Sequence, residues 1–369
     1  MTLQPFELER YFAKYEFNTR FLLSSSDCES RPIEELLSFE SGADEKFRKL
    51  WLGYIDSRGG PELRAAICSI YSRISADQIL CFAGAEEAIF LFMHAALSAG
   101  DEIVVHQPCY QALAEVPRAL GAKVVPWLAR VEHAWALDLD ELSQLVTKRT
   151  KAIVVNLPHN PSGFLMQASD FQKLSEFAES RGIILFSDEV YRESEYDPCD
   201  RLPAACEVSP SAVSLGVLSK SYGLAGLRVG WIATRNARVL ERMAELKDYT
   251  TICNAAPSEF LAALALRHRA KLTARNLEVI GSNLKELDRF FEKYADRFSW
   301  IRPKAGPIAF PKALKGSSRE LCKNAVTKAG VMLLPGIVFG SEYENHFRVG
   351  FGRKNMPEAL KALESFLGS

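Results

Sequence analysis

One lysine of the chain lies where its amine could do chemistry. Lys220 follows the apolar run 213–219 and stands in the sequence Ser-Lys-Ser-Tyr-Gly-Leu-Ala-Gly-Leu-Arg-Val-Gly-Trp. Lysine is rarely buried unless it is paired or reactive. Partial desolvation and the nearby Arg228 would lower the pKa of the amine below its free value of about 10.4. The sequence therefore predicts that Lys220 is a nucleophile or a Schiff-base partner.

Four further clusters follow predicted strands. They are Phe82-Ala83-Gly84-Ala85-Glu86-Glu87, Pro108-Cys109-Tyr110, the stretch 156–163 (Asn-Leu-Pro-His-Asn-Pro-Ser-Gly) and Ser187-Asp188-Glu189-Val190-Tyr191. In open α/β sheets, ligands bind outside the carboxyl ends of the strands. We therefore expect the five clusters to form one site.

Each cluster has a chemical and a structural explanation. The turn at Gly84 could present backbone N–H groups to a phosphate, or could simply allow tight packing. Tyr110 could cover a flat heterocycle or be an ordinary core residue. Asp188 could keep a pyridinium nitrogen protonated or cap a helix, and Tyr191 could reach the same ring. The stretch 156–163 offers an amide donor or is an ordinary turn.

Two patterns of secondary structure divide the sequence. Strands are predicted at 79–82, 102–106, 123–127, 152–156, 183–187 and 213–219, and helices at 86–97, 111–120, 139–146 and 171–180. A helix also opens at Pro61. This alternation is typical of β-α-β units and a mostly parallel sheet. After Asn254, long helical stretches over 259–294 precede a short α+β pattern that ends in a helix at 357–367.

The bulk composition excludes several classes of partner. The 369 residues include 45 Lys and Arg against 46 Asp and Glu, which gives no net field to attract nucleic acid or an acidic membrane. The eight cysteines contain no C-x-x-C pair, so we expect reduced thiols and no metal site. The start of the sequence shows neither an export signal nor a membrane span, and a cytoplasmic protein is expected.

The five clusters, in this order, resemble those of the class I/II aminotransferases, the aspartate aminotransferase family of pyridoxal-5′-phosphate (PLP) fold type I. The resemblance runs from about Tyr54 to the C-terminus and is most specific in the motif around Lys220. It implies an α/β fold with a mostly parallel seven-stranded sheet between helices and a smaller α+β domain. We place the large PLP-binding domain at 43–265 and assign 1–42 and 266–369 to an N-terminal arm and the small domain.

The resemblance also implies a role for each matching residue. Lys220 would form the Schiff base with PLP and move the proton during catalysis. Asp188 would pair with the pyridine nitrogen, Asn160 and Tyr191 would bind the 3′-oxygen, and Tyr110 would stack on the ring. The phosphate would be held by Gly84, Ala85, Glu86, Ser219 and Arg228, and by Tyr54 from the neighbouring subunit of a homodimer.

The substrate site is less completely defined by the motifs. Arg348, in His-Phe-Arg-Val-Gly-Phe-Gly-Arg, matches the arginine that grips the substrate α-carboxylate, and Asn160 would assist it; Arg353 is the competing candidate. Val217 stands where many relatives have a phosphate-binding serine. No motif gives a role to Arg58, to Ser25 and Ser26, or to the stretch 250–254.

The expected activity is ping-pong transfer of an amino group from an α-amino acid to a 2-oxo acid. The alternative on the same scaffold is a PLP-dependent lyase, of the β-elimination or C–S lyase type, or a decarboxylase. A nucleotide-dependent dehydrogenase would need a G-x-G-x-x-G turn, which 82–87 lacks. A DNA-binding regulator would need a basic segment, which the N-terminus does not offer.

Overall fold

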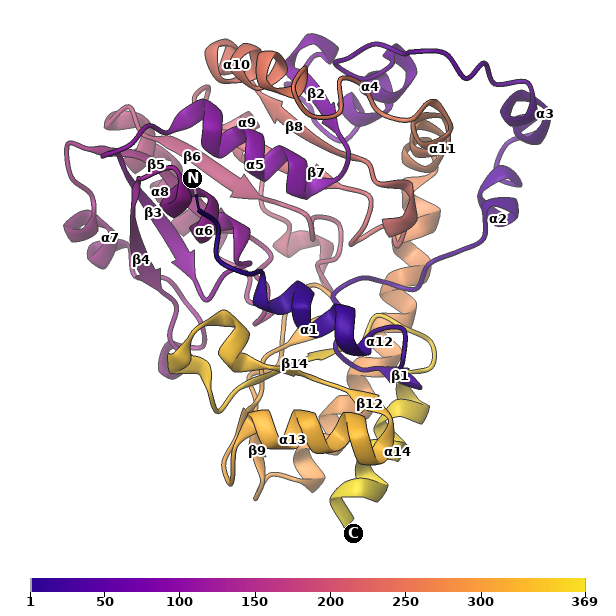
Figure 1. Ribbon diagram of the computed structural model, residues 1–369, viewed down its shortest axis with the longest axis vertical. Helices are drawn as coiled ribbons and strands as arrows, with labels where there is room; N and C mark the ends of the chain where they lie inside the picture. The colour runs from indigo at the N-terminus through magenta and orange to yellow at the C-terminus, as the bar shows by residue number, and fades with distance from the viewer. Residues whose placement is uncertain (1, 369) are drawn as a thin grey trace.

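The apolar runs form one seven-stranded sheet in the computed structural model, which describes residues 2–368 (Figure 1). In spatial order the strands are β2 (Ile79–Phe82), β8 (Gly230–Thr234), β7 (Val213–Val217), β6 (Ile184–Asp188), β5 (Thr150–Asn156), β3 (Glu102–Gln107) and β4 (Lys123–Leu128). Neighbouring strands are parallel except at β8, which is antiparallel to β2 and β7. The expected mostly parallel seven-stranded sheet is confirmed. The sequence analysis did not identify β8, because the first two residues of this short strand, Gly230 and Trp231, are the end of the lysine motif.

Helices cover both faces of the sheet, which explains why its strands are almost continuously apolar. Val105 and Val154 face the layer that contains α5 and α6. Val104, Ile153 and Val155 face the opposite layer, which contains α7 and α8. Successive residues of a strand point to opposite faces, so a strand between two helical layers needs apolar residues at every position.

The predicted helices are present with ends shifted by a few residues. The structure has α1 (Glu7–Tyr15), α2 (Ile33–Leu37), α3 (Ala43–Arg48), α4 (Pro61–Cys68), α5 (Ala85–Ala96), α6 (Ala112–Ala119), α7 (Leu139–Leu145), α8 (Ala168–Ser180), α9 (Ala205–Val208), α10 (Ala237–Lys247), α11 (Ala256–Arg267), α12 (Arg269–Lys293), α13 (Ser318–Asn324) and α14 (Met356–Gly368). The helical stretch predicted over 259–294 is two helices, α11 and α12, separated at His268.

A smaller α+β part lies below the large sheet in Figure 1. Its short strands are β1 (Phe21–Leu22), β9 (Phe298–Ser299), β10 (Ile308–Ala309), β11 (Lys312–Ala313), β12 (Val331–Met332), β13 (Leu334–Pro335) and β14 (Phe347–Gly350). β1 pairs in parallel with β12, and Phe21 and Leu23 share a core with α12 and α14. The N-terminal segment is therefore anchored on the C-terminal part of the chain.

The domain limits proposed from the sequence stay a prediction. Leu36 of α2 packs in the core cluster that contains Leu63 and Leu261 of the large domain, although it lies within the segment 1–42. The N-terminal segment thus has contacts with both parts of the molecule. Figure 1 shows α1 between the large sheet and the short strands of the small part.

All eight cysteines are free thiols, and five of them are buried. Among residues 2–368, no helix is both long and apolar enough to cross a membrane.

Candidate active site

The clusters singled out in the sequence meet at the carboxyl edge of the large sheet. β5 ends at Asn156 and β6 at Asp188, and the strand register places these two residues side by side. β7 ends at Val217, and Lys220 follows in the loop at the same edge. Parallel strands share one carboxyl edge, so residues far apart in the sequence come together there.

Strand β8 brings an arginine to the same edge. Because β8 is antiparallel, its first residue, Gly230, lies opposite Phe82 and Val217, the last residues of β2 and β7. Arg228 precedes this strand, and its Nη1 donates a 3.4 Å hydrogen bond to Ser219 Oγ. The direction of β8 therefore places the guanidinium beside the start of α5.

Two glycines allow this close approach. Gly84 precedes α5 with a φ of +94°, and a Cβ atom there would lie 2.5 Å from Nη2 of Arg228. A Cβ atom on Gly230 would lie 2.7 Å from the carbonyl carbon of Gly84. Free N–H groups at a helix N-terminus attract anions, and the adjacent guanidinium adds a positive charge. This corner of the site is therefore suited to a phosphate.

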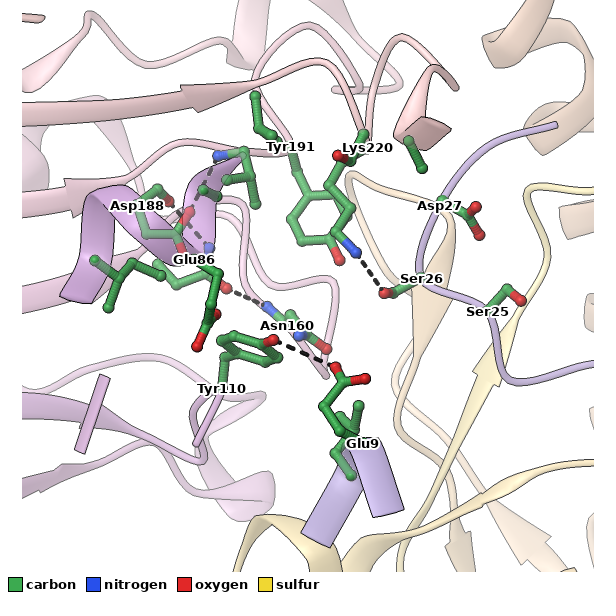
Figure 2. Close-up of a pocket in the computed structure, with 18 of the residues that line it drawn as sticks. Glu9, Ser25, Ser26, Asp27, Glu86, Tyr110, Asn160, Asp188, Tyr191 and Lys220 are labelled. Atoms are coloured by element: carbon green, nitrogen blue, oxygen red, sulfur yellow. Dashed lines mark hydrogen bonds between the residues drawn. The ribbon is translucent and has the colours of Figure 1, made fainter. Parts of the chain in front are cut away.

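A cavity of about 380 Å³ opens over the carboxyl edge (Figure 2). The residues singled out in the sequence that line it are Ala85, Glu86, Tyr110, Asn160, Asp188, Tyr191, Ser219, Lys220, Arg228 and Arg348. Gly84 adjoins the lining at Ala85. Tyr54 lies outside the cavity with 84% of its surface exposed. Val217, the departure from the usual serine, lines the cavity as an apolar residue.

The Lys220 amine projects into this cavity. Its Nζ donates a 2.9 Å hydrogen bond to Ser26 Oγ, and Figure 2 shows the two groups meeting there. Desolvation lowers the pKa of the amine below its usual value, the Asp27 carboxylate opposes this shift, and Arg348 adds to it. A lowered pKa increases the fraction of neutral amine, which is the nucleophilic form.

Asp188 is a buried carboxyl group facing the same space. Burial raises its pKa to about 7, while the backbone N–H of Val190 and the charge of Lys220 oppose the shift. Val190 N donates to Asp188 Oδ1 over 3.2 Å, and Asn156 Nδ2 donates to the Asp188 carbonyl oxygen over 3.0 Å. A cationic ligand beside Asp188 would stabilise the ionised carboxylate and offset the free-energy cost of its burial.

Tyr191 and Asn160 offer hydrogen-bonding groups between Asp188 and Arg348. The Tyr191 hydroxyl is buried and makes no hydrogen bond of good geometry among residues 2–368, although the nearby Ser26 hydroxyl lowers its pKa slightly. Desolvation raises its pKa, so the hydroxyl remains a donor at neutral pH. The Asn160 backbone N–H donates to Asn156 Oδ1 over 2.7 Å, and Asn160 Oδ1 accepts from Arg348 Nη1 over 3.2 Å.

Arg348 is the cation placed to bind a carboxylate. Its side chain is 1% exposed and donates to the Ser24 carbonyl oxygen and to Asn160, both of which are neutral. Its competitor Arg353 is already paired with Asp27 at 3.1 Å. Burying a guanidinium without a counter-charge is unfavourable in free energy, so an anionic ligand beside Arg348 would be stabilising.

Helix α1 supplies lining residues that the sequence analysis missed. They are Leu8, Glu9, Phe12 and Glu16. Glu9, Phe12 and Glu16 are spaced by three and four residues, which puts them on one face of a helix, and Leu8 lies one turn before Phe12. The spacing is visible in the sequence, but it does not show which surface this face covers.

Other residues left without a role have defined surroundings. Ser25 and Ser26 line the cavity. Arg58 is paired with Glu241 at 2.8 Å, away from the lining residues. In the stretch 250–254, the hydroxyls of Thr250 and Thr251 both donate to Glu87 Oε1.

Comparison with known proteins identifies the family. The model of the family described as aminotransferase class I and II matches residues 23–363. The chain belongs to this family. The match covers both the large sheet and the small part, so the fold and the PLP-dependent aminotransferase chemistry expected from the motifs are confirmed.

Three relatives match over almost their whole length. A PLP-dependent aminotransferase structure from Streptococcus suis is 30% identical with a TM-score of 0.94 and covers 100% of this chain and 98% of its own. A PLP-dependent cyclase structure is 28% identical with a TM-score of 0.91 and the same coverage. Capreomycidine synthase from Streptomyces vinaceus is 29% identical over 98% of this chain and 93% of its own.

The residues of the aminotransferase cavity fit PLP. The Tyr191 hydroxyl lacks a partner, and the glycine cradle beside Arg228 has no room for side chains but leaves backbone N–H groups for an anion. The donor set therefore matches a flat ring that carries a phosphate, a basic nitrogen and a phenolic oxygen. The Lys220 amine, the buried Asp188 carboxyl and the Arg348 guanidinium complete this set of groups around the cavity.

Proposed function

We propose that Lys220 carries the cofactor and moves the catalytic proton of an amino-acid transamination, in a site completed by a second copy of the chain. The observation that carries the proposal is the placement of the Lys220 amine, the Asp188 carboxyl and the Arg348 guanidinium around one cavity. Bound PLP supplies an electron sink conjugated to the substrate nitrogen, which stabilises negative charge at Cα.

Three residues would fix the cofactor ring. The Asp188 carboxylate would pair with the ring nitrogen and keep it protonated, because its burial makes a cationic partner favourable. The unpartnered Tyr191 hydroxyl and the Asn160 amide would bind the ring oxygen. Tyr110, which lines the cavity beside Glu86, would stack on the ring face.

The phosphate would bind where α5 begins. The backbone N–H groups of Ala85 and Glu86 lie at the N-terminus of this helix, directly after Gly84. Ser219 would add a hydroxyl and Arg228 a guanidinium. Charge-assisted hydrogen bonds of this kind are about twice as strong as neutral ones.

The substrate would be held between Arg348 and Lys220. Arg348 would bind the α-carboxylate, with Asn160 fixing the guanidinium through its 3.2 Å hydrogen bond. The neutral Lys220 amine would then take the proton from Cα and deliver it to C4′ of the cofactor. The lowered pKa of Lys220 supports this role, because a general base must be unprotonated when it acts.

A homodimer would complete the site with Tyr54. Trp51, Leu52 and Tyr54 form an exposed, largely apolar stretch with exposures of 76%, 77% and 84%. The buried Lys247 amine donates to the carbonyl oxygens of Ser57 and Ile252. It thereby joins the segment just after Tyr54 to the region Tyr249–Ile252, whose end residues are exposed. Exposed apolar surface of this extent is typical of an interface. Tyr54 would reach the phosphate of the neighbouring subunit.

We place the enzyme in the cytoplasm. The support is its cysteine chemistry, since all eight thiols are free and such thiols persist in a reducing compartment. Its partners would be an α-amino acid, a 2-oxo acid and a second copy of the chain, with no nucleic acid or membrane.

Elimination is the second candidate outcome. In β-elimination on the same scaffold, the bond that breaks after loss of the Cα proton lies at Cβ of the substrate, and the leaving group departs from Cβ. The residues that activate Cα would be the same, so the products distinguish the two outcomes.

The test is the absorption spectrum of the PLP-loaded protein during titration with a panel of amino acids, combined with analysis of the products. Transamination predicts conversion to the pyridoxamine form together with a stoichiometric 2-oxo acid. Release of ammonia or a cyclised product without that conversion would favour elimination. A visible band that survives Lys220→Ala would overturn the role of Lys220.

A further inference from the structure

We propose that the donor amino acid has a cationic side chain, an ammonium or a guanidinium, which Glu9 of helix α1 and Glu16 at its C-terminal end bind. The inference rests on the proposed function, because it assumes that the cofactor and the substrate α-carboxylate occupy their sites. It names the substrate class that the motifs left open.

Helix α1 holds the two carboxylates over the cavity. Glu9, Phe12 and Glu16 lie on one helical face and line the cavity. Figure 2 shows Glu9 extending from the helix toward Tyr110, and the Tyr110 hydroxyl lies 3.4 Å from Glu9 Oε1. Two carboxylates seven residues apart are separated by about 10 Å along a helix, which leaves room for an extended side chain between them.

The position of α1 is fixed by contacts with the large domain. Gln111 Nε2 donates to the Pro5 carbonyl oxygen over 2.9 Å, and its Oε1 accepts from Glu7 N over 2.9 Å. The rings of Phe6 and Tyr110 have centroids 5.0 Å apart. The carboxylates are therefore presented by a packed helix.

The charges that line the cavity do not balance once the cofactor and substrate backbone are bound. The acids are Glu9, Glu16, Asp27, Glu86 and Asp188, and the cations are Lys220, Arg228 and Arg348. Asp27 is neutralised by Arg353. The protonated ring nitrogen would pair with Asp188, the phosphate would pair with Arg228, and the α-carboxylate would pair with Arg348. The carboxyls left without a cation are Glu9, Glu16 and Glu86.

The surroundings of these carboxyls favour a positive ligand. Burial and the Asp27 charge raise the pKa of Glu16, while Arg353 and Lys220 oppose this shift without reversing it, and burial raises the pKa of Glu86 to about 7. Neither Glu9 nor Glu16 forms an ion pair with another side chain of residues 2–368. A bound cation would relieve this repulsion, whereas an acidic side chain would increase it.

An unpartnered hydroxyl independently indicates a ligand in the cavity. Ser25 lines the cavity, is 4% exposed and leaves its Oγ without a hydrogen-bond partner in the described chain. A hydroxyl oxygen can accept a hydrogen bond from an ammonium or guanidinium group. Tyr191 also has an unpartnered hydroxyl, but the proposed cofactor contact would use it.

Pairs of substrates with similar shape, of which only one member carries a positive side chain, test the inference. We would measure kcat/KM of the PLP-loaded enzyme for arginine against citrulline and for lysine against norleucine. We expect at least a tenfold preference for the cationic member of the better pair. Glu9→Gln and Glu16→Gln should each reduce that ratio several-fold. Glu7→Gln, on the same helix but not part of the lining, should leave it unchanged.

A binding measurement separates this inference from the proposed function. PLP-loaded Lys220→Ala protein, titrated calorimetrically with arginine and citrulline, should bind arginine more tightly whether or not turnover occurs. A neutral or acidic amino acid as the best donor, or ratios unaffected by Glu9→Gln and Glu16→Gln, would overturn the inference and leave the transaminase intact. If no amino acid converts the cofactor, the proposed function fails, and the binding preference alone decides the inference.

Discussion

The Lys220 amine donates a 2.9 Å hydrogen bond to the Ser26 hydroxyl, which joins the loop after β7 to the N-terminal segment (Figure 2). A hydroxyl that accepts from an amine stabilises the protonated form of that amine. The proposed attachment of PLP needs the neutral form. The contact therefore links the N-terminal segment to the reactivity of Lys220.

Ser26→Ala should speed the attachment of PLP to the cofactor-free protein. Loss of a hydrogen bond worth about 1 kcal/mol would increase the fraction of neutral Lys220 amine about fivefold. The growth of the visible absorption band at pH 7.5 measures the rate. Ser25→Ala is the matched control, because the Ser25 hydroxyl has no partner. A rate equal to that of the control would show that Ser26 does not tune the amine.

Arg348→Ala should raise KM about a hundredfold or more for every amino acid that reacts. The buried guanidinium has no counter-charge, so binding of the α-carboxylate would supply its ion pair. Steady-state kinetics measure the change. Arg353→Gln should have a much smaller effect, because Arg353 is already paired with Asp27. Equal effects of the two substitutions would remove Arg348 from this role.

The sequence was sufficient to predict most of the sheet, because a strand covered on both faces is apolar at nearly every position. The runs 102–106 and 152–156 therefore predict buried strands, and the corresponding strands β3 and β5 are present. Strand β8 was not identified, although it sets the position of Arg228. Its antiparallel direction follows from tertiary packing against β2 and β7, which local sequence does not encode.

The candidate site was predictable where a residue lies next to a strand end. Asp188 and Lys220 are such residues, and one cavity contains both. Glu9 and Glu16 were not predictable, because their position depends on where α1 packs. That packing is set by contacts of Gln111 with Pro5 and Glu7, about a hundred residues away in the sequence.

Asp188→Asn should lower kcat by about a hundredfold or more and leave the protein folded. An amide cannot supply the negative charge that keeps a pyridinium nitrogen protonated. Its oxygen can still accept the hydrogen bond from Val190 N, so the loop after β6 should be retained. Single-turnover kinetics and circular dichroism measure the two effects. Retained activity would rule out pairing of Asp188 with the ring.

Glu86→Gln should remove the contribution of the Glu86 carboxyl to the pH dependence of the free energy of unfolding. Burial raises the Glu86 pKa to about 7 from about 4.5, so the native cofactor-free protein holds this proton more tightly than the unfolded chain. The resulting stabilisation is complete below about pH 4.5 and is lost as the pH rises to about 7. Relative to wild type, the free energy of unfolding of Glu86→Gln should therefore rise by about 3 kcal/mol across this range.

Urea unfolding of both proteins, at one protein concentration and without PLP, measures this difference. The Asp188 carboxyl is present in both proteins, so the effect of its burial cancels in the comparison, and only the smaller effect of the Glu86 charge on its pKa remains. A difference that does not change with pH would mean that the Glu86 carboxyl ionises normally in the folded chain.

Gly84→Ala should weaken PLP binding by about tenfold or more. The alanine would have to adopt a φ of +94°, and its Cβ would lie 2.5 Å from the Arg228 guanidinium. Gly100→Ala is the matched control, since Gly100 has a φ of +88° with no atom within 4 Å of the added Cβ. Both variants should lose about 1 kcal/mol or more of stability through backbone strain. The loss of PLP affinity, measured by equilibrium titration, should appear in Gly84→Ala alone, because the clash with Arg228 disturbs the proposed phosphate site.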